Sequence, residues 1–166
     1  LVDIIPEFNL YEEFWKIYTK SDAIPPQYID ASGKVSRCII GEGTEIYGDV
    51  ENSVIGSCVT IGEGAVIRNS IIMNGVTIGD GAVIDKAIIA ENVEVGKNAH
   101  LGVGEEAVNE MKPAVYAFGL VTIGENSVIP DGVSIGKNTA IYGKTEPSDY
   151  PDGALKSGGS IIKAGE

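Results

Sequence analysis

His100 is the only histidine in this sequence of 166 residues, so acid–base chemistry near neutral pH would have to use its imidazole. It lies within residues 98–102, directly before a break in a repeated pattern. The position ordinarily holds threonine or valine in such repeats. A surface or subunit-contact histidine is therefore the simpler interpretation, and a catalytic base is the alternative.

Arg68 and Lys86 are the most informative cations, because few basic residues interrupt the repeats. The alignment of neighbouring repeats places Arg68 beside Asp85 and Asn69 beside Lys86. An exposed ion pair between repeats, worth roughly 0–1 kcal/mol, is the simpler interpretation. The functional alternative is an anion site for a phosphorylated effector, with Arg68 and Lys86 as its candidate residues.

The remaining composition excludes several classes of function. Asp and Glu number 24 against 12 Lys and Arg, and this net charge of −12 argues against nucleic-acid or anionic-membrane partners. Cys38 and Cys58 form neither a disulfide framework nor a metal-ligand cluster, and we interpret them as small apolar side chains in a reducing compartment. No glycine-rich phosphate loop, membrane-length apolar run or secretory signal is found. We expect a cytoplasmic protein, with no catalytic residue, metal or cofactor in this chain.

The elements that must position these residues follow a six-residue period. An aliphatic residue followed by glycine recurs at Ile40-Gly41, Ile55-Gly56, Ile61-Gly62, Ile78-Gly79, Val95-Gly96, Ile123-Gly124 and Ile135-Gly136. This pattern predicts a parallel β-helix built of hexapeptides. Ile55, Ile72 and Ile89 give coils of 17 residues. The shorter step of 15 residues from Ile40 to Ile55 predicts a tight corner at Tyr47-Gly48-Asp49.

Three segments are expected. Residues 1–29 form a linker with a short amphipathic helix at 9–19, which Pro25-Pro26 ends. Residues 30–142 form the β-helix, interrupted at 103–119 by an excursion with one helical turn that Pro113 ends. Residues 143–166 form a proline- and glycine-containing loop that folds back to cap the last coil.

The flanks of the repeat resemble a known family. Trp15-Lys16-Ile17-Tyr18-Thr19 and the following Pro25-Pro26 are similar to the linker of bacterial glucose-1-phosphate adenylyltransferase (ADP-glucose pyrophosphorylase). Asn52-Ser53-Val54 and Gly119-Leu120-Val121-Thr122 resemble coils of its C-terminal left-handed β-helix. The hexapeptide resemblance supplies the left-handed coiling.

The resemblance implies that this chain is the C-terminal part of a longer protein. In that family an N-terminal nucleotidyltransferase domain makes ADP-glucose and pyrophosphate from ATP and glucose 1-phosphate, for glycogen or starch synthesis, with Mg²⁺ and ATP bound there. No catalytic residue transfers to this chain. The implied roles are homo-oligomer assembly, with the parent a tetramer, contact with the catalytic domain, and allosteric control by a phosphorylated small molecule.

Departures from the family leave alternatives open. Positions that carry activator lysines in plant-type relatives correspond to Glu91 and Glu125 here, with Lys86 as the nearest cation. We therefore expect weak or absent activation. The alternatives are another sugar nucleotidyltransferase such as a mannose-1-phosphate guanylyltransferase, a non-catalytic paralogous subunit, and a hexapeptide acyltransferase with His100 as general base.

Overall fold

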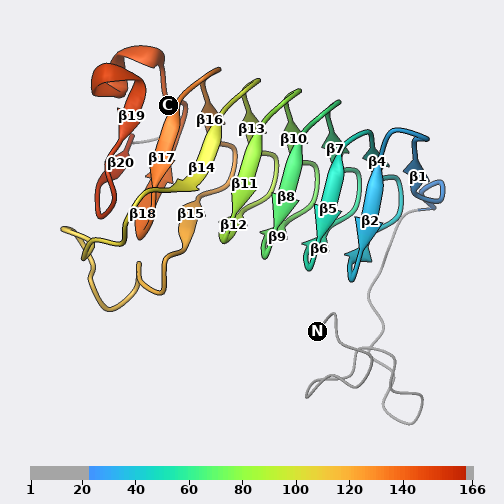
Figure 1. Ribbon diagram of the computed structural model, residues 1–166, viewed down its shortest axis with the longest axis horizontal. Coiled ribbons are helices and arrows are strands. Elements are labelled where there is room, and N and C mark those ends of the chain that lie inside the picture. The colour runs from blue at the N-terminus through green and yellow to red at the C-terminus, as the bar shows by residue number, and fades with distance from the viewer. Residues whose placement is uncertain (1–22, 164–166) are drawn as a thin grey trace, which may run out of the picture.

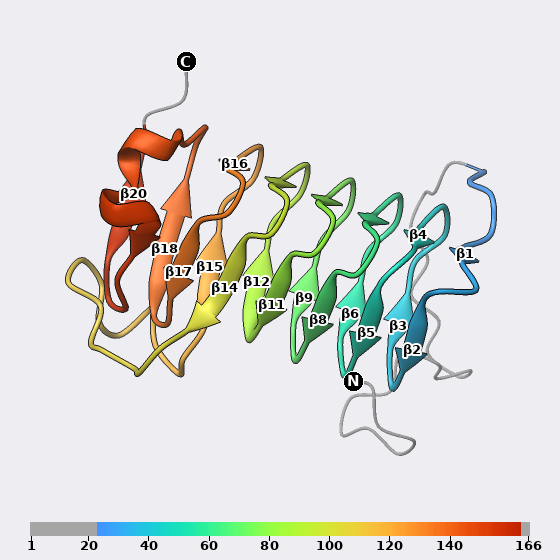
Figure 2. The ribbon, with the colours of Figure 1, turned by 45° about the horizontal axis from the view of Figure 1, so that its top comes forward.

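The computed structural model describes residues 23–163, which wind into about eight turns of a left-handed parallel β-helix. Figure 1 shows the coils stacked side by side from β1 to β20, and Figure 2 shows the same stack tilted. The predicted fold class is confirmed. The helix expected at residues 9–19 lies outside the described residues. No helix within the described part is long and apolar enough to span a membrane.

Three parallel sheets form the faces of the solenoid. Sheet A contains β1 (Tyr28–Ile29), β4 (Glu45–Ile46), β7 (Thr60–Ile61), β10 (Thr77–Ile78), β13 (Glu94–Val95) and β16 (Val128–Ile129). Sheet B contains β2 (Lys34–Ser36), β5 (Asp49–Glu51), β8 (Val66–Arg68), β11 (Val83–Asp85), β14 (His100–Val103), β17 (Ser134–Gly136) and β19 (Ala154–Leu155). Sheet C contains β3 (Ile39–Ile40), β6 (Val54–Ile55), β9 (Ile71–Ile72), β12 (Ala87–Ile89), β15 (Val121–Ile123), β18 (Thr139–Tyr142) and β20 (Ser160–Ile162).

The core is a stack of aliphatic side chains contributed by successive coils. Ile55, Ile72 and Ile89 are at most 1% exposed and pair in register, which confirms the 17-residue coil. Because each strand is only two to four residues long, its stability depends on stacking against the coils before and after it.

The short coil has a simple structural cause. Only Tyr47 and Gly48 join β4 to β5, whereas four residues join β7 to β8 in the next coil. A β carbon on Gly48 would overlap the carbonyl oxygen of Ala65, so the tight corner requires glycine. The predicted corner is confirmed.

The excursion leaves the solenoid at a second required glycine. Gly102 has a φ of 88°, and a β carbon there would overlap the carbonyl oxygen of Asp85. The excursion does contain one helical turn, but it lies after the expected place: the amides of Val115 and Tyr116 both donate to the carbonyl of Lys112. Pro113 begins this turn and does not end it, because proline at the first position of a turn has no amide hydrogen to leave unpaired.

The tail differs from the loop expected at residues 143–166. Strands β19 and β20 pair with β17 and β18 and extend sheets B and C by one coil. Two short 3₁₀ helices, Pro147–Asp149 and Pro151–Gly153, lie between β18 and β19. Between them Tyr150 is 3% exposed, and its hydroxyl lies 2.8 Å from the Thr145 hydroxyl. The buried tyrosine packs against the core cluster, so the segment both continues the solenoid and covers part of its end.

Candidate functional site

The candidate cations lie where sheet B turns into sheet C, a ridge that we call the B–C corner. Arg37, Asn52, Asn69 and Lys86 occupy equivalent corner positions in four successive coils, with φ of 53°, 48°, 51° and 53°. Asparagine tolerates this left-handed conformation better than most residues do. The corner geometry therefore explains the asparagines, whereas Arg37 and Lys86 occupy it at a conformational cost.

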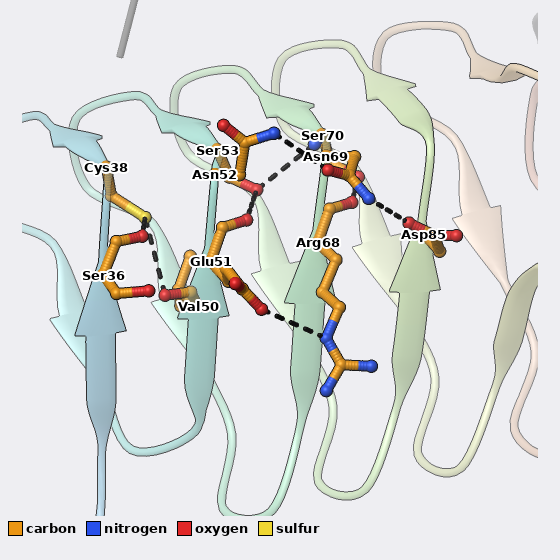
Figure 3. Close-up of polar contacts among 10 residues, drawn as sticks. All are labelled: Ser36, Cys38, Val50, Glu51, Asn52, Ser53, Arg68, Asn69, Ser70 and Asp85. Carbon is orange, nitrogen blue, oxygen red and sulfur yellow. Dashed lines mark hydrogen bonds and ion pairs between the residues drawn. The ribbon is translucent and has the colours of Figure 1, made fainter. Parts of the chain in front are cut away.

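The corner is tied together by a ladder of side-chain hydrogen bonds (Figure 3). The Asn52 amide nitrogen donates to the Asn69 side-chain oxygen at 2.8 Å, and the Asn69 amide nitrogen donates to an Asp85 carboxylate oxygen at 2.8 Å. Beside it, the Ser53 hydroxyl accepts from the amide of Ser70 at 3.2 Å. These bonds link one coil to the next and hold the corner backbone in place.

Arg68 makes its ion pair with a different partner from the one predicted. The expected register is correct, since Arg68 pairs with Glu51 on one side and Asp85 on the other. Its Nε lies 3.6 Å from a Glu51 carboxylate oxygen, while Asp85 accepts from Asn69 (Figure 3). Both side chains of the pair are more than half exposed, so it contributes roughly 0–1 kcal/mol.

Lys86 lies one coil further along, and its amide donates to the Arg68 carbonyl. Its ammonium group makes no ion pair with any residue in 23–163. The structure thus brings the two candidate cations together through the backbone, while the Arg68 guanidinium is directed to Glu51 in the preceding coil.

Arg68 also lines a shallow groove of about 310 Å³ on the outer surface of sheet B. Lys34, Asp49 and Glu51 supply its other charges, so two cations face two carboxylates. A phosphorylated ligand would meet no net positive charge there, which favours the structural interpretation of Arg68 over a strong anion site.

His100 begins β14 and is exposed, with Val83 and Ser134 beside it in sheet B. The hydrogen bonds that hold the excursion run to Asn138, Gly158 and Ser160, on later coils of the B–C corner. Among the described residues, no hydrogen bond joins the excursion to the His100 side chain. The arrangement is that of an exposed surface histidine.

The sequence interpretation missed the buried Asn109, which anchors the excursion. Its side chain is 1% exposed, and its amide nitrogen donates to the Asn138 carbonyl at 2.8 Å. Its side-chain oxygen accepts from the amides of Met111 and Lys112 at 2.9 and 2.8 Å. The side-chain nitrogen of Asn138 in turn donates to the Ala107 carbonyl of the excursion at 2.8 Å. A polar residue inside an irregular segment is the one signal of this role in the sequence.

A second polar cluster lies on the first coil, where Asp30 accepts hydrogen bonds from Ser32 and Tyr28. The Ser32 hydroxyl is 2.7 Å and its amide 2.9 Å from one carboxylate oxygen, and the Tyr28 hydroxyl is 3.0 Å from the other. These donors stabilise the ionised form and lower the pKa of Asp30 to about 2.

We expect an NMR titration to place the pKa of Asp30 at about 2, and the Ser32→Ala variant to raise it because the strongest donor is lost. Because the pKa of Asp30 is lower in the folded chain, its ionised carboxylate stabilises the fold at pH values above the ordinary pKa of 3.8. This stabilisation is lost as the pH falls through the folded pKa of about 2. Tyr28→Phe, which removes a weaker donor, is the matched comparison and should raise the value less. An ordinary pKa near 3.8 in the unmodified chain would contradict this account.

Comparison with known proteins decides the family. A family model described as the EIF2B subunit epsilon LbH domain matches residues 16–108, more than half of the chain. The chain belongs to this family. LbH stands for left-handed β-helix, which is the fold that the three parallel sheets of this chain form.

Curated relatives match this LbH domain along its whole length. The glucose-1-phosphate adenylyltransferase of Lachnospira eligens is 68% identical over 166 residues, which is 100% of this chain and 39% of the relative. That of Acetivibrio thermocellus is 43% identical with the same coverage, and that of Thermotoga sp. (strain RQ2) is 53% identical over 98% of this chain and 38% of the relative. The matched region is the C-terminal part of these proteins, which confirms the resemblance seen in the sequence.

Solved structures add little to this. The GDP-perosamine N-acetyl transferase of Caulobacter crescentus is 17% identical, covers 84% of the LbH chain and 51% of its own, and has a TM-score of 0.31. A likeness at this level carries no argument about the function of the LbH domain.

Proposed function

We propose that this chain is the C-terminal assembly and regulatory domain of a glucose-1-phosphate adenylyltransferase that makes ADP-glucose for glycogen synthesis. The observation that carries the proposal is 68% identity over all 166 residues to a relative of that name. The chain spans 39% of the relative's length, and we assign catalysis, Mg²⁺ and ATP to the part of the longer protein outside it. The partners would be that catalytic domain and further copies of the subunit, in the cytoplasm.

The shape of the solenoid supports a scaffold role. A stack of short strands with one continuous aliphatic core forms an elongated, rigid body whose three flat outer faces are available to neighbours (Figures 1 and 2). Residues 23–163 hold no cluster of three or more histidine, cysteine or acidic side chains placed to bind a metal ion. In the proposed arrangement this domain positions the catalytic domains, and the reaction takes place in the rest of the longer protein.

The substrate assignment is tested on the longer gene product that contains this chain. With Mg²⁺, ATP and glucose 1-phosphate we expect ADP-glucose and pyrophosphate, whereas GTP with mannose 1-phosphate should give little product. The 166-residue chain alone should turn over neither pair. Acetyl transfer from acetyl-CoA by the chain alone, lost in His100→Ala, would instead establish the acyltransferase alternative.

We expect weak effector activation through the B–C corner. Because the Arg68 groove carries no net positive charge, fructose 1,6-bisphosphate should raise the rate of the longer protein less than about twofold. Lys86→Ala and Arg68→Ala should change that response little, as should the matched variant Lys137→Ala on a later coil. A several-fold activation that disappears in Lys86→Ala would show that the corner is an effector site.

A further inference from the structure

Sheet C differs from the other two sheets in the chemistry of its outer surface, which we call the C face. Successive coils place Ile39, Val54, Ile71, Ile88, Thr122 and Ala140 in one outward row. The next outward row contains Met73, Ala90, Tyr142 and Ile162, with glycine in its other coils. Neither row, within the described strands, contains a charged residue.

The outer surfaces of the other sheets are charged. Glu45 and Glu94 project from sheet A, and Asp49, Glu51 and Arg68 project from sheet B. In a chain with a net charge of −12, the C face is thus the surface of residues 23–163 that another copy could approach without bringing acidic side chains together.

The excursion forms a raised wall at one end of the C face. In Figures 1 and 2 it swings out from β14 and passes the β18–β20 end of the solenoid before returning to β15. A mainly apolar hollow of about 280 Å³ lies between the excursion and sheet C, lined by Met111, Lys112 and Tyr116 on one side and by Tyr142 and Ile162 on the other. Lys112 is its one charged lining residue, and a lysine there does not repel the acidic surface of a second copy. The C face is therefore flat over its early coils and walled over its late coils.

Phe118 of the excursion is an independent sign of a partner. It is 82% exposed and has a φ of 63°, a left-handed conformation that is uncommon for a bulky residue. Val115, nearby in the excursion, is 64% exposed, and Val108 is 74% exposed. An exposed aromatic ring on a strained backbone raises the free energy of an isolated chain. Burying the ring against a partner would offset that cost.

We propose that the C face binds a second copy of this chain in an antiparallel, two-fold arrangement. In this arrangement the excursion wall of each copy lies over the flat early coils of the other, so that Phe118 of one copy packs on the outward row near Val54 and Ile71 of the other. A two-fold contact of this kind is self-complementary and closes after two copies. The inference rests on the proposed assembly function and specifies its surface.

The size of the face explains why the excursion is needed. The seven strands of sheet C, about 4.8 Å apart, give a face about 29 Å long and about 10 Å wide, on the order of 300 Å² in projection. Stable interfaces bury about 800 Å² of accessible surface on each partner. The flat rows alone fall short, and the exposed side chains of the excursion supply additional apolar area.

The test is sedimentation of the 166-residue chain at micromolar concentrations. The unmodified chain should sediment as a dimer, at twice the subunit mass of 17.4 kDa. Ile71→Lys and Met73→Lys are made separately, and both positions are 40% exposed in the chain. Each should weaken the dimer at least about tenfold, because the two-fold contact would desolvate one new lysine from each copy. Thr77→Lys, an exposed residue on sheet A of the same coil, is the matched control and should leave the dimer unchanged.

A second variant separates association from folding. Phe118→Asn should weaken the dimer at least about tenfold by removing the ring. At a dilution where both chains are monomeric, it should keep or raise the melting temperature, because asparagine tolerates the left-handed backbone better than phenylalanine does. A monomeric unmodified chain would overturn the proposal, as would a dimer that persists in both Ile71→Lys and Phe118→Asn or is broken by Thr77→Lys. These outcomes are independent of whether the longer protein makes ADP-glucose.

Discussion

Replacing Ile72 with alanine should lower the free energy of unfolding of this chain by about 2–5 kcal/mol. Ile72 is 1% exposed and lies in the aliphatic stack between Ile55 and Ile89, one coil away on either side. Alanine would leave a cavity that the coils cannot close, because the strand spacing is fixed by backbone hydrogen bonds. The cavity would also weaken both coil-to-coil contacts on which a solenoid depends.

Urea unfolding followed by circular dichroism measures this effect. The matched control is Val83→Ala, which changes an outward, half-buried residue of β11 on sheet B, away from the proposed dimer contact. It should cost about 1 kcal/mol or less. Equal losses in the two variants would mean that inward and outward positions are wrongly assigned.

Replacing Asn109 with alanine should release the excursion from the solenoid, at a cost of about 2–4 kcal/mol. The buried Asn109 side chain donates to the carbonyl of Asn138 and accepts from the amides of Met111 and Lys112. Without it these backbone groups lose their partners in a place with little access to water, so we expect the excursion to detach and hydrate.

Hydrogen exchange reports this release directly, since the amides of Met111 and Lys112 should exchange faster while those of the coils before residue 100 keep their protection. Asn74→Ala is the comparison, because Asn74 is exposed and bonds the Ser57 amide and Glu91 at the surface. Its loss should cost about 1 kcal/mol or less and leave the excursion protected. Unchanged exchange at Met111 in Asn109→Ala would contradict the anchoring role.

The solenoid could be predicted from the sequence because its contacts recur at a fixed offset. Ile55, Ile72 and Ile89 are neighbours in space for the same reason that they are 17 residues apart. Even the short coil is predictable, since removing two residues from a corner shifts the spacing to 15 and leaves Gly48 as the mark of a tight approach. A regular repeat converts one-dimensional spacing into three-dimensional register.

The excursion and the tail are less predictable because they do not follow the period. Asn109 meets Asn138 and Ser160 across 29 and 51 residues, and no recurring spacing indicates either contact. In the tail, β19 and β20 follow two 3₁₀ helices, so the prolines and glycines suggest a loop where the chain adds one more coil. The turn residues do form turns there, but they connect two further strands.

Strand register alone does not predict the ion-pair partner of the candidate cation Arg68. Strand pairing correctly places Arg68 between Glu51 and Asp85, yet it does not tell which carboxylate the guanidinium contacts. The Asn69 side-chain nitrogen donates to the Asp85 carboxylate, so the Arg68 guanidinium pairs with Glu51 instead. Side-chain competition of this kind depends on corner geometry, which the sequence pattern does not encode.

We propose that this chain assembles a glucose-1-phosphate adenylyltransferase and that the rest of the longer protein catalyses the reaction. This is tested by comparing the longer protein with a version that ends before residue 23, for which both the sedimented mass and the formation of ADP-glucose are recorded. We expect the intact protein to form ADP-glucose as an oligomer, and we expect removal of the β-helix to lower the sedimented mass to that of a smaller assembly. An unchanged oligomeric state after removal, or ADP-glucose formation by the 166-residue chain alone, would contradict it.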